Sequence, residues 1–328
     1  MQLIYAYQEW PYRETFRISR GATATSDLFF AAVRDGDLIG RGECGILPQY
    51  GHTQELVRAE FERARQLLET GIDRAGLQQV DLNPSVRNAI DAALWDLDCR
   101  RAGVDVWSLA CVERPASLMV DLTISIATAE KMCADAKRAV GAGYGLLKLK
   151  ADAESVLPRV EAIAQACPGV KLIVDANEAW DLQTLSQLDR PLADLGVVLI
   201  EQPLPHDGDQ ALSDYRGQVP LCADESCRDI NDLPDLVDRY QAINIKLDKV
   251  GGLTPALDLA RAAKARELKL MVGCSGPTSL GAAPAYVLGA LADFLDLDGP
   301  ALLLEDRPSP MRYVDGRLLA FEPALWGG

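Results

Sequence analysis

The chain has 328 residues, of which 48% are hydrophobic and 25% are charged, and its formal net charge is −15. This composition is typical of a folded globular protein and excludes a largely disordered chain. The strongly negative charge argues against partners that present phosphate groups, so we expect neither nucleic acid nor an anionic membrane surface as a partner.

The start of the chain and its cysteines indicate the compartment. The first ten residues lack a basic stretch followed by an apolar run, so we expect no signal peptide. The longest apolar stretch, near residues 280–291, contains Pro284 and is too short to span a bilayer. Eight cysteines occur without a Cys-x-x-Cys pair, which favours reduced thiols over a disulfide framework. We therefore expect a cytoplasmic protein.

Residues 1–115 read as strands followed by helices. The segments 16–19 and 28–33 have the apolar character of strands. Helices are expected over 53–68 and from residue 83 to about 103, each starting at a residue that can cap a helix N-terminus. This part of the chain is therefore predicted to form an α+β unit.

From about residue 118 onward, short apolar runs alternate with helical stretches. The runs recur at intervals of roughly 22 to 27 residues, the length of one strand, one helix and two loops. They are 119–126, 145–150, 171–175, 197–201, 219–224, 242–246, 269–273 and 294–297. Eight such units predict a closed parallel barrel over residues 116–305. A hairpin near 313–318 suggests that the tail, 306–328, folds back onto the first unit.

Carboxylates end three successive strands of this predicted barrel. They are Asp175, Glu201 and Asp224. Barrel enzymes place their reactive groups where strands end, and three carboxylates at one place repel each other unless a cation lies among them. Oxygen ligands suit a hard ion such as Mg²⁺, and no histidine or cysteine is placed to favour zinc.

Lysines end the strands on both sides of these carboxylates. Lys150 precedes them and Lys246 follows them, so a closed barrel would place the two amines on opposite sides of the ion. Lys148 has the same strand parity as Lys150. A neighbouring ammonium and the metal ion would lower the pKa of Lys150 toward neutrality. Two bases on opposite faces of one carbon can remove a proton on one side and return it on the other, as in racemisation or epimerisation.

Five motifs carry a family resemblance. They are Lys148-Leu149-Lys150, Val174-Asp175-Ala176-Asn177-Glu178, Glu201-Gln202-Pro203-Leu204, Asp224-Glu225-Ser226 and Ile245-Lys246-Leu247-Asp248-Lys249. With them, nearly the whole chain resembles the enolase superfamily, more narrowly the muconate-cycloisomerase-like subgroup and its L-Ala-D/L-Glu (dipeptide) epimerases. The resemblance implies a modified TIM-type (β/α)7β barrel with an α+β capping domain formed by the N-terminal segment and the C-terminal tail.

The resemblance also implies roles for individual residues. Asp175, Glu201 and Asp224 would bind Mg²⁺, and Lys150 and Lys246 would be the acid/base catalysts. Three further residues would support them: Lys148 by tuning Lys150, and Asn177 and Glu225 beside the metal ligands. The implied reaction inverts the α-carbon of the C-terminal residue of a dipeptide by two-lysine proton transfer through a metal-stabilised enolate.

Two features bear on the substrate. The run Asp296-Leu297-Asp298-Gly299-Pro300 is the mark of the dipeptide epimerases, in which Asp296 and Asp298 would hold the substrate ammonium; the alternative is a solvated acidic turn. Arg20, on a predicted loop of the capping domain, is either a partner for an acidic substrate side chain or a surface arginine. The chain also departs from the family at Gln49-Tyr50-Gly51-His52 and at Ser275-Gly276-Pro277, which leaves the preferred dipeptide open.

Several alternatives remain at this point. A muconate-type cycloisomerase or an N-acylamino-acid racemase would use the same lysines and metal, but has no obvious need for two aspartates near the substrate. A sugar-acid dehydratase is disfavoured because neither His52 nor His206 follows the seventh strand. A catalytically inactive binding protein is disfavoured because every expected acid and both bases are present. Assembly into a homo-oligomer is left open.

Overall fold

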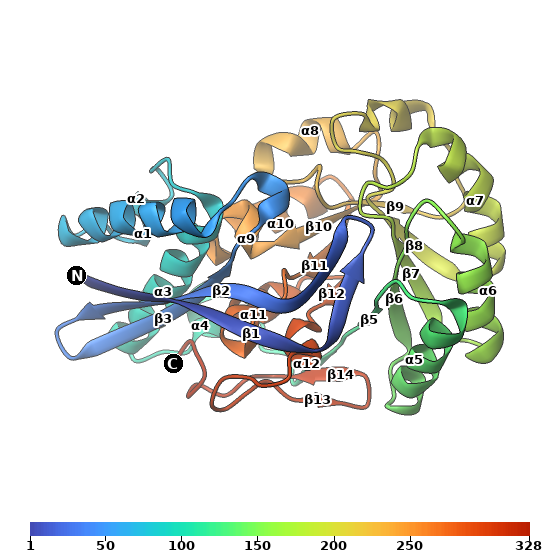
Figure 1. Cartoon of the computed structure of the whole chain (residues 1–328). Coiled ribbons are helices and arrows are strands. Elements are labelled where there is room, and N and C mark those ends of the chain that lie inside the picture. Colours follow the sequence, from blue (N-terminus) through green and yellow to red (C-terminus); the bar gives the residue numbers. More distant parts are fainter.

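A computed structural model describes residues 1–328 (Figure 1). An antiparallel sheet with its own helices lies beside a larger parallel sheet, whose helices cover its outer side. The tail of the chain returns along the edge of both parts. This arrangement confirms the barrel with a separate capping unit that the sequence predicts.

The N-terminal sheet has the order β1-β2-β3 and pairs antiparallel throughout. Its strands are Gln2–Ile18, Gly21–Asp35 and Leu38–Gly45. The predicted strands 16–19 and 28–33 are therefore only parts of β1 and β2. The rest of β1 and all of β3 were missed, because exposed polar positions interrupt the apolar pattern: Leu3 is the only fully buried residue of β1.

Four helices follow this sheet. They are α1 (Gln54–Glu69), α2 (Arg74–Leu77), α3 (Pro84–Ala102) and α4 (Val106–Ala110). The expected helices over 53–68 and 83–103 are confirmed as α1 and α3. Helix α3 packs very closely on β3, since a Cβ atom at Gly40 would lie 1.9 Å from Ala93 O and one at Gly42 would lie 2.1 Å from Ala89 O. Only glycine fits this contact.

Eight parallel strands form the barrel. They are β5 (Leu122–Ile124), β6 (Leu146–Lys150), β7 (Lys171–Asp175), β8 (Val197–Glu201), β9 (Leu221–Ala223), β10 (Ala242–Lys246), β11 (Lys269–Gly273) and β12 (Phe294–Asp296). They follow one another in this order across the sheet. A backbone hydrogen bond of 3.0 Å from Asp121 N to Leu295 O joins the β5 edge to the β12 edge.

Helices occupy most of the connections between these strands. They are α5 (Ala129–Gly141), α6 (Val156–Ala166), α7 (Leu182–Asp194), α8 (Leu233–Leu236), α9 (Leu247–Val250), α10 (Leu253–Lys264) and α11 (Ser279–Gly289), with α12 (Gly299–Leu302) after the last strand. The connection from β8 to β9 holds only a 3₁₀ turn, Asp209–Asp214. No helix has the length and apolar character to cross a bilayer.

One predicted barrel strand was wrong. The segment 119–126 is divided into β4 (Ser117–Met119) and β5, and only β5 belongs to the barrel. Strand β4 instead pairs with β14 (Arg317–Leu319), which forms the predicted C-terminal hairpin with β13 (Tyr313–Val314). The two residues between β4 and β5 therefore turn the chain into the barrel instead of continuing a strand.

The C-terminal tail contacts the first unit as well. The indole Nε1 of Trp326 donates to Arg41 O and Ala92 O, and Gly327 N donates to Asp96 Oδ1. Trp326 is completely buried in these contacts. The exact boundaries of the capping and barrel domains, at residues 115 and 306, stay predictions of the sequence.

The barrel interior is layered. Six consecutive strands each contribute one buried apolar residue to a closed cluster: Leu146, Ile173, Leu199, Cys222, Ala242 and Met271. Side chains alternate along a strand, so the residues two positions later also point inward. Those residues include Lys148, Asp175, Glu201, Asp224 and Asn244. An apolar layer thus lies beneath a layer of charged and polar groups at the carboxyl ends of the strands.

A buried carboxylate joins the capping unit to the barrel. Asp248 of α9 accepts hydrogen bonds from Asn88 Nδ2 at 2.8 Å and from Gly45 N at 3.4 Å. Burial raises the pKa of Asp248 to about 7. Because the folded pKa lies above the unfolded value, the stability that this group contributes is present at low pH and is lost as pH rises through about 7.

Replacing Asp248 by asparagine should therefore flatten the dependence of stability on pH. Relative to the parent, the free energy of unfolding of Asp248→Asn should rise by about 2 kcal/mol between pH 5 and pH 8. Urea unfolding at both pH values measures this difference. The exposed Asp258→Asn change on α10 is the control. Parallel pH profiles for parent and Asp248→Asn would contradict the assignment.

Candidate active site

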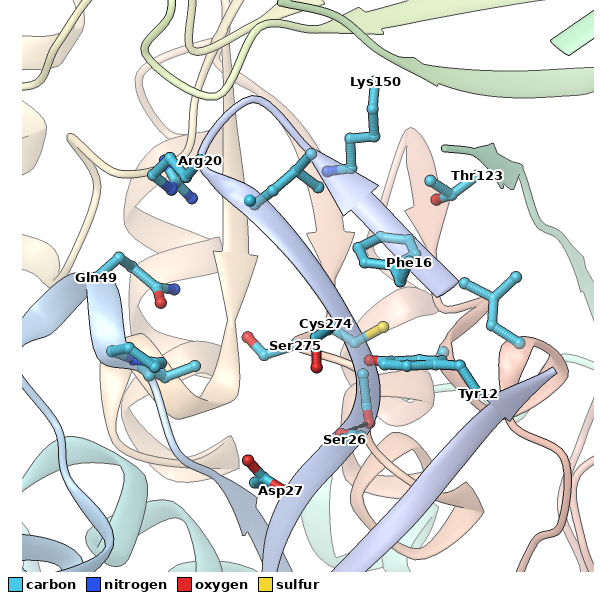
Figure 2. Close-up of a pocket in the computed structure, with 18 of the residues that line it drawn as sticks. Tyr12, Phe16, Arg20, Ser26, Asp27, Gln49, Thr123, Lys150, Cys274 and Ser275 are labelled. Atoms are coloured by element: carbon cyan, nitrogen blue, oxygen red, sulfur yellow. Dashed lines mark hydrogen bonds between the residues drawn. The ribbon is translucent and has the colours of Figure 1, made fainter. Parts of the chain in front are cut away.

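A cavity of about 520 Å³ opens at the carboxyl ends of the barrel strands. The β1–β2 hairpin lies across it and contributes Tyr12, Phe16 and Arg20 to its lining (Figure 2). Lys150 points into the cavity from the barrel, and Thr123 lies nearby. The capping unit and the barrel therefore build this site together.

Three predicted metal ligands lie side by side at the rim of the barrel. Asp175 and Glu201 end β7 and β8 and are direct neighbours in the ladder, and Asp224 follows β9. Their exposed fractions are 0%, 0% and 2%. The alternation of each strand points them inward above the apolar layer, so the three carboxylates lie in a row along the rim of the barrel.

Lysine ammonium groups contact each of these carboxylates. Lys150 Nζ donates to Asp175 Oδ2 at 2.6 Å, and Lys246 Nζ donates to Asp224 Oδ2 at 2.7 Å. Lys148 Nζ lies 2.7 Å from Glu201 Oε2 and 3.2 Å from Asp175 Oδ2. The predicted lysines and the predicted metal ligands thus form one connected charged layer.

This layer shifts the pKa values of its acids in different directions. Burial alone would raise the pKa of Asp175, but Lys150 and Lys148 bring it below its ordinary value. Asp224 behaves in the same way, with Lys246 lowering its pKa against the effect of burial. The pKa of Glu201 is raised to about 7, first by burial and then by the charge of Asp175.

The two predicted catalysts reach the cavity from opposite sides. Lys150 ends β6 and Lys246 ends β10, and both line the cavity. The strands β7, β8 and β9 separate them in the eight-stranded sheet, so four steps around the barrel lie between them in either direction. A ligand between them presents one face to each amine.

The residues at this layer fit a hard divalent ion. The donors are all oxygens, and Asn177 Oδ1 is buried without accepting a hydrogen bond. Glu201 Oε2 is contacted by the ammonium of Lys148. Neither histidine takes part, since His52 contacts Asn83 and His206 contacts Glu178. This donor set matches the ligands that Mg²⁺ prefers.

The backbone is strained directly after two of these ligands. Asn177, Glu178 and Gln202 have φ values of 43°, 68° and 33°, in the left-handed region. The same segments position the acids, since Asn177 N donates to Asp175 Oδ1 and Gln202 Oε1 accepts from Asp224 N. Strain of this kind persists where the surroundings fix it, and it is common at functional sites.

Arg20 is placed at the cavity by the β1–β2 turn. Its Nη1 lies 2.8 Å from Glu225 Oε1 and 3.3 Å from Glu178 Oε2, and it also donates to Asn177 O. Burial, and then the charge of Asp224, raise the pKa of Glu225. Arg20 therefore joins the capping hairpin to the predicted residues beside the metal ligands, while 32% of its side chain stays exposed.

Two predicted substrate ligands form another wall of the cavity. Asp296 and Asp298 are 5% and 3% exposed, so the alternative of a solvated acidic turn is wrong. Lys148 Nζ donates to Asp296 Oδ2 at 2.6 Å, and Thr123 N donates to Asp298 Oδ2 at 2.6 Å. Burial, and then the charge of Asp296, raise the pKa of Asp298 to about 6.

Asp121 lies next to Asp296 and Asp298. One oxygen from each of Asp121, Asp296 and Asp298 lies within 4.8 Å of the others. The predicted metal ligands do not reach that mutual spacing, and the ammonium of Lys148 lies between Asp175 and Glu201. The assignment of the metal to the β7–β9 carboxylates therefore stays a prediction.

Sequence reasoning missed three polar residues of this site. Lys249 Nζ donates to Asp224 Oδ1 at 2.5 Å and to Asn244 O at 3.0 Å, and Asn244 Nδ2 donates to Glu201 Oε1 at 2.7 Å. Asn244 shares the parity of Lys246 on β10, which was a usable signal. The third, Asp121, lay inside a segment predicted as continuous strand, which hid its direction.

The two departures from the family pattern differ in their placement. Gln49, Ser275 and Gly276 line the cavity. His52 does not, and Pro277 lies at a small separate cleft. Gly276 is also in close contact with the capping hairpin, since Ser26 Oγ donates to its carbonyl at 2.6 Å. The first three are therefore placed to influence the choice of substrate.

Comparison with known proteins agrees with this architecture. The mandelate racemase / muconate lactonizing enzyme N-terminal domain model matches residues 1–110, and the enolase C-terminal domain-like model matches residues 131–321. The L-Ala-D/L-Glu epimerase of Escherichia coli is 38% identical over 319 residues, covering 97% of this chain and 99% of that protein. An N-acetyl-D-glutamate racemase from a Pseudoalteromonas species is 38% identical over 292 residues, covering 85% and 92%.

A solved structure gives the same result for the fold. It is an enolase family member from Agrobacterium tumefaciens with homology to dipeptide epimerases, bound to sodium and L-Ala-L-Glu. Its TM-score is 0.95 at 39% identity, and the match covers 99% of both chains. The chain therefore belongs to the mandelate racemase and muconate lactonizing enzyme family of the enolase superfamily.

Proposed function

We propose that the chain is a Mg²⁺-dependent dipeptide epimerase of the L-Ala-D/L-Glu type, which inverts the α-carbon of the C-terminal residue. One observation carries this proposal: Lys150 and Lys246 reach one cavity from opposite sides of the barrel, with a row of buried carboxylates between them. The likeness to the E. coli epimerase and to the Agrobacterium protein that binds L-Ala-L-Glu supports it.

In the proposed reaction, one lysine removes the proton from Cα and the other delivers a proton to the opposite face. The C–H bond breaks, the electron pair is delocalised toward the substrate carboxylate, and the new C–H bond forms with inverted configuration. Mg²⁺ held by Asp175, Glu201 and Asp224 would supply positive charge that stabilises the negative charge on the substrate carboxylate. A substrate of the other configuration reverses the roles of the two lysines.

Asp224 influences the protonation of Lys246. Burial lowers the pKa of Lys246, but the charge of Asp224 raises it by more, so it lies above its ordinary value. A divalent cation held by Asp224 would weaken that attraction and would repel the ammonium of Lys246. We therefore expect the neutral amine that removes the α-proton to be accessible only in the metal-loaded protein.

Asp296 and Asp298 favour a dipeptide over the substrate of the main alternative function. An N-acylamino-acid racemase would use the same lysines, and the Pseudoalteromonas racemase makes this a real candidate. An N-acyl group has no positive charge, whereas the ammonium of a free dipeptide can pair with two buried carboxylates that line the cavity. The buried aspartates favour the dipeptide.

Deuterium exchange distinguishes the two functions. In deuterium oxide with Mg²⁺, L-Ala-L-Glu should incorporate deuterium only at Cα of the glutamate and convert to L-Ala-D-Glu, as followed by NMR and mass spectrometry. N-acetyl-L-glutamate should exchange more slowly. Faster exchange of the acetylated amino acid would favour the racemase, and no exchange with any dipeptide of a library would contradict the proposal.

Arg20 should influence the preference for an acidic substrate side chain. Its guanidinium lines the cavity, so it can share its charge with a substrate carboxylate while it contacts Glu225. In Arg20→Gln, kcat/KM for L-Ala-L-Glu relative to L-Ala-L-Gln should fall about 10- to 100-fold. The exposed Arg261→Gln change is the control. An unchanged ratio would contradict a role of Arg20 in substrate preference, and its contacts with Glu225 and Glu178 would then be structural.

We also infer a cytoplasmic location. All eight cysteines are free, which agrees with a reducing compartment. Fractionation of cells that express the protein at native levels tests this inference, and recovery in a secreted fraction would contradict it.

A further inference from the structure

The cavity is longer than the dipeptide that the proposed function places in it. Strand β2 contributes lining residues from Gly21 to Asp27, and at about 3.3 Å per residue this segment extends over roughly 20 Å. The backbone of a dipeptide covers about 7 Å. In Figure 2, Arg20 and Asp27 lie at opposite ends of the view, with Gln49 and Ser275 between them. L-Ala-L-Glu therefore does not fill the cavity.

Asp27 is a carboxylate at one end of this cavity without a cationic partner. It is partly buried, and no lysine or arginine nitrogen lies within 4.0 Å of its oxygens. Its Oδ1 accepts hydrogen bonds from Tyr7 Oη at 3.1 Å and from Thr25 Oγ1 at 3.5 Å. The Tyr7 hydroxyl also lies 3.2 Å from Glu9 Oε1, so two carboxylates share one proton donor. A positive charge supplied by a ligand would therefore be favoured beside Asp27.

An apolar strip of the cavity wall adjoins Asp27. It consists of Ile46, Leu47 and Pro48, and Ile46 N donates to Asp27 O at 3.1 Å, so the strip begins beside the acid. Lysine and arginine side chains suit this combination, because their aliphatic stems pack on apolar surface while their heads carry the charge. An apolar side chain of the same length would match the strip but would place its end against a carboxylate.

Tyr12 connects this region to the aspartates proposed for the substrate ammonium. A Cβ atom added to Gly276 would collide with Tyr12 Oη and would lie 3.2 Å from Ser26 Oγ, so these groups are close together. Burial raises the pKa of Tyr12 to about 12, and the charges of Asp298 and Asp27 add to this shift. The Tyr12 hydroxyl is therefore near both acids. A residue whose ammonium binds at Asp298 can thus extend its side chain toward Asp27.

We propose that Asp27, with the apolar strip of residues 46–48, forms a subsite for a cationic side chain on the N-terminal residue of the dipeptide. The substrates would then include L-Lys-L-Glu and L-Arg-L-Glu beside L-Ala-L-Glu. This inference rests on the proposed epimerase function and names a further class of its substrates. Asp27 contacts only the side chain of the first residue, so it sets specificity and takes no part in the proton transfer.

Comparison of lysine with norleucine at the first position tests the proposal, because norleucine has the same stem and lacks only the ammonium group. In the parent, kcat/KM for L-Lys-L-Glu should exceed that for L-norleucyl-L-Glu about tenfold. In Asp27→Asn this ratio should fall to about one. Both substrates are measured on the same preparation, so partial misfolding of the variant leaves the ratio unchanged. An equal ratio in parent and variant would overturn the proposal.

Two further variants and the salt dependence control this comparison. Asp27→Lys should place the ratio below one, because like charges then meet at the end of the cavity. Asp37→Asn on the exposed β2–β3 turn is the matched control and should keep the parent ratio. Because Asp27 is partly exposed, added salt should lower the ratio in the parent. A parent ratio that does not respond to salt would count against a charge contact at Asp27.

Binding measured without turnover separates this inference from the proposed function. If the parent exchanges no dipeptide, but calorimetry shows tighter binding of L-Lys-L-Glu than of L-norleucyl-L-Glu and Asp27→Asn removes that difference, the epimerase fails and the subsite stands. If the parent epimerises L-Ala-L-Glu but treats the lysine and norleucine dipeptides equally, the subsite fails and the epimerase stands. If the parent prefers lysine and Asp27→Asn keeps that preference, the cation binds elsewhere and the assignment to Asp27 is overturned.

Discussion

Replacing Lys150 or Lys246 by alanine should lower the rate of epimerisation at least about 10³-fold, because each amine is needed on its own face of Cα. One lysine cannot perform both steps, since it reaches the cavity from one side of the barrel only. NMR of the interconversion of L-Ala-L-Glu and L-Ala-D-Glu measures this loss.

The two variants should differ in which isomer they still exchange. Each retains one amine, so each should still exchange the α-proton of a single isomer in deuterium oxide, and the two variants should act on opposite isomers. The exposed Lys264→Ala change on α10 is the control and should behave like the parent. Equal exchange from both isomers in either variant would contradict the two-face assignment.

Neutralising Asp175, Glu201 or Asp224 should abolish activity through loss of Mg²⁺. Asp175→Asn, Glu201→Gln and Asp224→Asn keep the shape of each side chain but remove the charge that holds a hard cation. Mg²⁺ affinity should fall more than about 100-fold. Replacing a residue that only hydrogen-bonds to a metal ligand already lowers metal affinity about 10- to 100-fold, and these three residues would bind the ion directly. Calorimetric titration with Mg²⁺ measures the affinity directly.

Thermal stability should also show that these variants no longer bind Mg²⁺. Mg²⁺ binds the folded protein, so it should raise the Tm of the parent but not of these three variants. Asp296→Asn is a suitable control, because Asp296 contacts the same Lys148 as Asp175 and Glu201 do but is assigned to the substrate. That variant should bind Mg²⁺ normally. Normal Mg²⁺ binding by any of the three ligand variants would remove that residue from the metal site.

Much of the barrel and of its charged layer could be predicted, because short inward-facing strands alternate regularly. A five-residue strand such as Leu146–Lys150 directs Lys148 and Lys150 to the same side, and its end marks the rim. The same pattern applies to Asp175 and Glu201 at the ends of β7 and β8. The distances between these side chains depend on whether the sheet closes into a barrel. The eight predicted strands indicated that it does.

Other features depend on tertiary contacts that no local pattern encodes. Arg20 contacts Glu225 across 205 residues, through a hairpin whose long strands were mostly missed. Lys249 lies in the short helix α9, directly after β10. The path of the backbone there sets the direction of its side chain, and the sequence pattern does not predict that path. Asp121 follows β4, and only the pairing of β4 with the C-terminal hairpin shows that the barrel begins after it.

A crystal structure with Mg²⁺ and L-Ala-L-Glu bound tests the two-base arrangement most directly. Nζ of Lys150 and Nζ of Lys246 should lie on opposite faces of the glutamate Cα, with the ion held by Asp175, Glu201 and Asp224. Both amines on one face of that carbon, or the ion held instead by Asp121, Asp296 and Asp298, would contradict the proposed epimerase.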